Sequence, residues 1–209
     1  MDQNNVKNII FDLGNVIINV DTELTVKAMK NLGFNNFQKS YTLFKQTDLF
    51  DRLEKGEITP NQLRNELRKH MENQVSDEEF DRAWGAMLLD FPKERIDLIK
   101  KLGNKYNLYL LSNTNEIHYQ QYIKDFKAVY GFDFNSLFIK AYYSHQVGFR
   151  KPDIQIYEHM IKNSKLIPEE SVFIDDLKIN IEEAKKTGLQ TLWLDIENGE
   201  DVTCVLDGF

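Results

Sequence analysis

Residues 8–16 read NIIFDLGNV, an apolar run that stops abruptly at Asp12. A short continuous apolar run bounded by polar residues is typical of a strand that is buried on both faces. Such strands occur in parallel sheets covered by helices, and ligands bind outside the carboxyl ends of those strands. This run, with its strand expected over 6–11, therefore predicts that Asp12 lies at the functional edge of a parallel sheet.

Four further apolar runs follow along the chain, at 108–111, 137–143, 172–174 and 191–194. Ile96, Ile99 and Leu102 recur at helical spacing before Gly103, and helical patterns also cover 156–161 and 181–188. Strands that alternate with helices in this way favour an α/β fold, with a Rossmann-like parallel sheet and helices on both faces.

The segment between residues 20 and 90 breaks this alternation, because it contains no convincing strand. Leu63, Leu67 and Met71 are spaced four apart, which marks one face of a helix, and residues 80–87 suggest another. We therefore expect an α-helical unit inserted after the first strand. The expected division is a core of residues 1–18 and 90–209, and a helical unit of residues 19–89.

The composition narrows the class of protein. The chain has 209 residues, of which 42% are hydrophobic, enough for a packed core, and a net charge of −7, which argues against binding nucleic acid. Its single cysteine, Cys204, rules out an intrachain disulfide.

No apolar run approaches the ~20 residues of a membrane span, and the polar N-terminus does not resemble a signal peptide. We expect a cytoplasmic protein with no membrane partner, as a monomer or weak dimer.

Polar side chains follow several of the predicted strands. Asp12 follows the first, Ser112 and Asn113 follow the second, and the pair Asp175–Asp176 follows the fourth. Carboxylates gathered at one edge repel one another unless a cation joins them, and Mg²⁺ prefers such oxygen ligands. A lysine together with hydroxyl and amide donors suits a phosphate, and a free carboxylate oxygen suits covalent catalysis. The pattern therefore predicts phosphoryl chemistry on a small phosphorylated metabolite.

Four short segments carry a family resemblance. They are FDLGNV at 11–16, LSNT at 111–114, RKPD at 150–153 and FIDD at 173–176. In this order they resemble the four motifs of the haloacid dehalogenase-like (HAD) hydrolase superfamily, and the inserted helices resemble its small α-helical cap. Together with EKGEI at 54–58, the motifs are most similar to the branch that contains bacterial sugar-phosphate phosphatases active on glucose 1-phosphate.

The resemblance implies a magnesium site and a nucleophile. Asp12 would attack phosphorus through one carboxylate oxygen and bind Mg²⁺ through the other. The backbone carbonyl of Gly14 would also bind the metal. Asp176 would be the main ligand from the second strand, with Asp175 as a supporting or direct ligand. Asn180 would support the site by hydrogen bonding.

The resemblance also implies the residues that bind the phosphate. Lys151 would bridge Asp12 and the phosphate. Ser112 would donate a hydrogen bond to the phosphoryl group, helped by the backbone at Asn113. His118 lies six residues after Ser112, so it is a candidate to face the substrate. In the helical insert, the candidates for selecting the substrate are Phe44, Asp48, Phe50 and Glu54.

One position departs from the pattern. The common motif has a second aspartate two residues after the nucleophile, as general acid and base, whereas this chain has Gly14. Asp21 or a metal-ordered water are candidate replacements. Two alternative functions stay open at this point: a metal-independent 2-haloacid dehalogenase, and a non-catalytic binding or regulatory module. The intact Asp12 and Lys151 favour an enzyme, and the pair Asp175–Asp176 favours metal-dependent chemistry.

Overall fold

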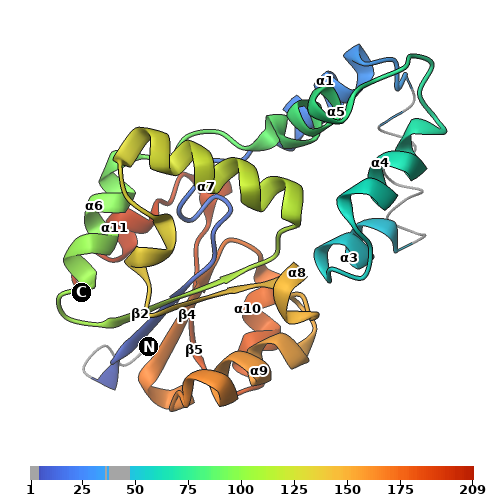
Figure 1. The fold of residues 1–209 in the computed structure, drawn as a ribbon. Coiled ribbons are helices and arrows are strands. Elements are labelled where there is room, and N and C mark those ends of the chain that lie inside the picture. The colour runs from blue at the N-terminus through green and yellow to red at the C-terminus, as the bar shows by residue number, and fades with distance from the viewer. Residues whose placement is uncertain (1–4, 36, 38–47) are drawn as a thin grey trace.

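A computed structural model of the chain describes residues 5–35, 37 and 48–209. At its centre is a five-stranded parallel sheet with the order β3-β2-β1-β4-β5 (Figure 1). The strands are β1 (Asn8–Phe11), β2 (Asn107–Ser112), β3 (Lys140–Tyr143), β4 (Ser171–Asp175) and β5 (Gln190–Trp193). β1 is the central strand, and the chain builds from it first to one edge and then to the other. This arrangement confirms the predicted parallel α/β fold.

Helices cover both faces of the sheet. Ile9 and Phe11 of β1 point into one apolar layer, whereas Ile10 points into the layer on the opposite face. The first layer is covered by α6 (Lys93–Leu102), α7 (Glu116–Tyr130) and α11 (Val202–Val205). The second is covered by α9 (Ile154–Ser164) and α10 (Lys178–Lys185) (Figure 1). Burial on both faces explains why β1, β2 and β4 consist mainly of apolar residues.

The strand predicted over 137–143 begins three residues later than expected. Residues Phe134–Leu137 form a short 3₁₀ helix, η3, in which the Asp133 side chain accepts a hydrogen bond from Asn135 N. The apolar residues of this turn pack into the same layer as residues of the strand. The apolar sequence pattern therefore begins before the strand does. The remaining short elements are α8 (Ser144–Val147), η4 (Pro168–Glu170) and η5 (Ile196–Asn198).

Between β1 and α6 lie α1 (Thr22–Asn31), α3 (Leu49–Glu54), α4 (Pro60–Arg68), α5 (Asp77–Trp84) and η2 (Gly85–Met87). These helices share an apolar cluster of their own, which includes Leu63, Phe80 and Trp84. Reciprocal hydrogen bonds at Thr59 and Ser76 form capping boxes that start α4 and α5. In Figure 1 the group lies beside the sheet, with α5 next to α7 and α3 next to α8.

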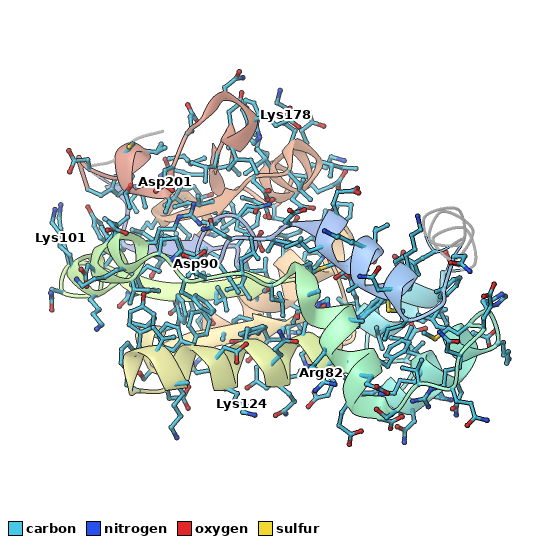
Figure 2. All side chains as sticks on the ribbon, turned by 90° about the horizontal axis from the view of Figure 1, so that it is seen from above. Arg82, Asp90, Lys101, Lys124, Lys178 and Asp201 are labelled. Atoms are coloured by element: carbon cyan, nitrogen blue, oxygen red, sulfur yellow. The ribbon has the colours of Figure 1, made fainter. Side chains whose placement is uncertain are left out.

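Charged side chains cover the outer surface. Lys124 of α7 and Lys178 of α10 point away from the molecule on opposite sides of the sheet (Figure 2). Across the described ranges, every helix is too short or too polar to cross a bilayer.

Candidate active site

Three carboxylates meet at the carboxyl ends of β1 and β4. Because these strands are paired in parallel, with Phe11 opposite Ile174, the residues that follow them lie side by side. Asp12 N donates to the carbonyl of Ile174 at 2.9 Å, which extends the pairing by one residue. One carboxylate oxygen from each of Asp12, Asp175 and Asp176 lies within 4.8 Å of the other two. The structure thus brings together the acidic residues singled out in the sequence.

Lys151 is enclosed between two of these carboxylates. Its Nζ donates to Asp12 Oδ1 at 2.6 Å and to Asp175 Oδ2 at 2.7 Å, and only 1% of the side chain is exposed. Burial would lower the pKa of Lys151, but the attraction of Asp12 and Asp175 outweighs it, so the pKa lies above its ordinary value. Lys151 is therefore a fixed positive charge beside Asp12.

One lysine does not balance three carboxylates. Burial raises the pKa of Asp12 to about 7, with further repulsion from Asp175 and Asp176, although Lys151 opposes the shift. Burial also raises the pKa of Asp176, and Asp175 adds to that effect. A divalent cation would relieve this excess negative charge, and carboxylate oxygens are the ligands that Mg²⁺ prefers. The donor set therefore fits a magnesium ion.

Hydrogen bonds divide the roles of the two consecutive aspartates. Both oxygens of Asp175 accept from Asn180 Nδ2 at 3.0 Å, and Oδ1 also accepts from Leu177 N at 2.8 Å. With Lys151 on Oδ2, the Asp175 carboxylate is held on all sides. The Asp176 carboxylate accepts from Asn15 Nδ2 at 3.1 Å, and it is less enclosed by donors than Asp175, so it keeps more lone pairs for a metal.

Sequence reasoning missed Asn15. Its backbone is left-handed, with φ of 57°, and its Oδ1 accepts from Val20 N at 3.1 Å, so that Nδ2 points at Asp176. Asparagine tolerates this conformation better than most residues. An asparagine in the turn directly after β1 and Asp12 was the available signal.

The side chain of Asn113 holds the peptide of Lys151. Asn113 Nδ2 donates to the Lys151 carbonyl, and the Lys151 N–H donates to Asn113 Oδ1, both at 2.8 Å. This pair joins the end of β2 to the backbone of Lys151. Ser112, at the end of β2, is buried with its Oγ 3.4 Å from the Asn113 carbonyl, so its hydroxyl is only weakly engaged.

Asn113→Ala is expected to lower the free energy of unfolding by about 1–3 kcal/mol, because two backbone groups of Lys151 lose their partners. Urea denaturation measures the change, and Asn163→Ala, which removes a surface bond to Lys140, is the matched control. Equal stability of the two variants would show that the pair does not hold the lysine segment.

His118 is buried and both of its ring nitrogens are engaged. Asn115 Nδ2 lies 3.1 Å from Nδ1, and Nε2 lies 3.1 Å from the carbonyl of Trp84, whose ring stacks on the imidazole. Because Asn115 donates to Nδ1, the ring proton resides on Nε2. Burial lowers the pKa of His118 to about 4, so the ring is neutral at physiological pH. A contact between His118 and substrate stays a prediction.

A cavity of about 250 Å³ opens between the sheet edge and the inserted helices. Gly14, Ser112 and Asn113 line it from the sheet, and Phe50 and Glu54 line it from α3. The remaining candidates lie elsewhere. Asp21 is exposed and caps α1 through Glu23 N, Asp48 is exposed before α3, and Phe44 lies outside the described residues.

Comparison with known proteins agrees with this geometry. Residues 9–194 match the family model of haloacid dehalogenase-like hydrolases. The chain is 33% identical over 196 residues to a D-ribitol-5-phosphate phosphatase of Bacteroides thetaiotaomicron, covering 94% of each chain.

Two solved structures are similar along nearly their whole length. A HAD family enzyme of Bacteroides thetaiotaomicron, in complex with magnesium and inorganic phosphate, is 36% identical with a TM-score of 0.89, over 96% of this chain and 99% of that one. A predicted HAD-like hydrolase of Porphyromonas gingivalis is 30% identical with a TM-score of 0.87, over 97% of each chain.

The parallel sheet and its cluster of aspartates and lysine define a hydrolase of the α/β class. The chain belongs to the haloacid dehalogenase-like hydrolase family.

Proposed function

We propose that this protein is a magnesium-dependent phosphatase of a small phosphate monoester, a sugar phosphate or sugar-alcohol phosphate. The observation that carries the proposal is the cluster of three carboxylates within 4.8 Å, with Lys151 bonded to Asp12. The relative that hydrolyses D-ribitol 5-phosphate and the solved complex with magnesium and phosphate support the same reading. The paired Asp175–Asp176 gives no advantage to a metal-free dehalogenase.

Asp12, Asp176 and the backbone carbonyl of Gly14 would hold Mg²⁺, with Asp175 as a further or supporting ligand. Bound there, the ion would neutralise phosphoryl oxygens and make phosphorus easier to attack. Asn15 would keep Asp176 oriented and Asn180 would keep Asp175 oriented, as their hydrogen bonds indicate.

The chain's own residues perform the transfer. Lys151 fixes Asp12 Oδ1 at 2.6 Å, which keeps the nucleophile oriented at the sheet edge. An Asp12 oxygen attacks phosphorus and the substrate oxygen leaves, so an aspartyl-phosphate forms and the alcohol departs. Lys151 and Ser112 donate to the phosphoryl oxygens as their charge grows. Water then attacks the phosphorus of this intermediate and releases inorganic phosphate.

The inserted helices would act as a cap that chooses the substrate. We place the cap at residues 19–89 and the core at 1–18 and 90–209. Phe50 and Trp84 give the cavity an apolar wall, and Glu54 adds a carboxyl group to that wall. His118 would support the wall through Trp84, since its ring is held by that residue's carbonyl. Closure of such a cap excludes water from the reaction.

Phosphate release from a panel of sugar and sugar-alcohol phosphates, with and without Mg²⁺, tests the function. We expect magnesium-dependent release that is strongest for one compound. A parallel assay for halide release from 2-haloacids without metal tests the dehalogenase alternative. Halide release without phosphate release would overturn the proposal, and release of neither product would favour a binding module.

Magnesium is expected to stabilise the protein, and more so as the pH rises from about 4 to about 7. Asp12 has a raised pKa of about 7 in the folded metal-free protein, against 3.8 unfolded. In this window the folded state binds the extra proton, so raising the pH removes stability. Mg²⁺ competes with that proton for Asp12 and compensates the negative charge of the three carboxylates.

At 100 times its dissociation constant the ion adds about 2.7 kcal/mol, which corresponds to a melting temperature higher by roughly 5–10 °C. Thermal unfolding at several pH values, with Mg²⁺ or a chelator, measures both effects. A shift that is independent of pH, or absent, would contradict the metal assignment.

Two further expectations from the sequence stay predictions: that the protein is cytoplasmic, and that it is a monomer or weak dimer. Size-exclusion chromatography with light scattering measures the second.

A further inference from the structure

The cavity lacks a proton donor at the position where one is expected. Departure of an alkoxide from phosphorus is helped by a general acid, an effect of about 10²–10⁴-fold. Gly14 has no side chain to provide it. Crowding does not force the glycine, because a Cβ at this position would meet only Val20 Cγ2, at 3.7 Å. The other walls of the cavity therefore hold the side chains that could provide the proton.

Glu54 carries the one carboxyl group among the described residues that line this cavity. It is the last residue of α3 and lines the cavity from the inserted helices, whereas Gly14 and Ser112 line it from the sheet edge. Its side chain keeps 27% of its surface accessible, and its enclosed Oε2 atom forms an ion pair with Arg150 Nε at 2.8 Å. This ion pair holds the carboxyl group in the cavity wall.

The other polar groups of the wall are poorer donors. His118 has both ring nitrogens engaged, and its low pKa leaves no imidazolium at neutral pH. Burial raises the pKa of the Tyr122 hydroxyl well above 10. Burial also raises the pKa of Glu54, against the attraction of Arg150, so this carboxyl keeps a proton to higher pH than a solvated glutamate.

Arg150 positions Glu54 and ties it to the catalytic lysine. Arg150 Nε forms an ion pair with Glu54 Oε2 at 2.8 Å, and Nη1 donates to Asp51 Oδ1 at 2.7 Å. Lys55 Nζ, next to Glu54, lies 3.0 Å from Asp153 on the same core segment. Since Arg150 directly precedes Lys151, one segment places both the lysine at the nucleophile and the glutamate of the cap.

We propose that Glu54 is the general acid and base of the reaction, in place of the side chain missing at Gly14; this rests on the proposed phosphatase function. As Asp12 bonds to phosphorus and the bond to the leaving oxygen breaks, the Glu54 proton passes to that oxygen and completes the alcohol. In the second step water bonds to phosphorus, its proton returns to the Glu54 carboxylate, and the bond to Asp12 breaks.

The test compares two leaving groups in Glu54→Gln. The leaving group of D-ribitol 5-phosphate is a strongly basic alkoxide that needs a proton. The leaving group of p-nitrophenyl phosphate is a stable phenolate that does not. We expect kcat/KM to fall about 10²–10⁴-fold for the first compound and to change little for the second. Loss of the base in the second step should lower kcat for p-nitrophenyl phosphate and produce a burst of p-nitrophenolate.

Two further variants separate chemistry from structure. Glu66→Gln makes the same change at a partly exposed glutamate of α4 that pairs with Lys69 and lines no wall of the cavity, so it should keep both activities near wild type. Gly14→Asp in the Glu54→Gln background returns a carboxyl to the usual position, where there is room for it, and should restore part of the D-ribitol 5-phosphate activity.

An equal fall for both compounds, or no fall for either, would overturn the role of Glu54. A wild-type protein that hydrolyses neither compound would instead overturn the phosphatase function itself.

Discussion

Asp12→Asn is expected to lower kcat by roughly 10⁴–10⁶-fold while the protein stays folded. The amide lacks the negative charge that makes a carboxylate oxygen nucleophilic, and its neutral oxygen is a weaker ligand for Mg²⁺. Folding should survive, because Lys151 keeps its bond of 2.7 Å to Asp175 and one of three repelling carboxylates is gone. Steady-state phosphate release measures the loss, and circular dichroism checks the fold.

Asp97→Asn, on the exposed face of α6, is the matched control and should keep full activity. Residual turnover of Asp12→Asn within tenfold of wild type would mean that water, rather than Asp12, attacks phosphorus.

Lys151→Met is expected to lower both stability and activity. The side chain is 1% exposed and pairs with Asp12 and Asp175, so its removal leaves two buried carboxylates without their cation, at a cost of about 3–5 kcal/mol. The charge that stabilises the transition state is also lost, which should lower kcat by about 10²–10³-fold. Urea denaturation and steady-state kinetics measure the two effects.

Mg²⁺ should restore part of the stability of Lys151→Met, since the ion replaces the missing positive charge, but little of the activity. Lys178→Met, an exposed lysine of α10, is the control. A Lys151→Met protein as stable as wild type in the presence of chelator would show that the buried pairs contribute nothing to folding.

The sheet and its functional edge could be predicted because their signals are local. Each strand is a short apolar run, and in a parallel sheet the residue after the run lies at the same edge as its neighbours. Asp12, Asp175 and Ser112 were therefore found from position alone. The start of β3 was misjudged because the apolar residues of η3 pack into the same layer as the strand.

The contacts between cap and core could not be predicted, because no local pattern encodes them. Arg150 and Asp51 are 99 residues apart in sequence, and the stacking of His118 on Trp84 likewise joins two separate segments. The motif at 54–58 drew attention to Glu54 only as a selector of substrate. Its pairing with Arg150 and its place in the cavity wall became visible only in the fold.

The central claim is that phosphate passes through Asp12 with the help of magnesium. Its most direct test is a rapid acid quench of the wild-type protein during turnover, followed by mass spectrometry of the peptide that contains Asp12. A phosphoryl adduct on Asp12 is expected, formed before phosphate is released and only when Mg²⁺ is present. Phosphate release without any adduct on Asp12, or at an unchanged rate in chelator, would contradict the account.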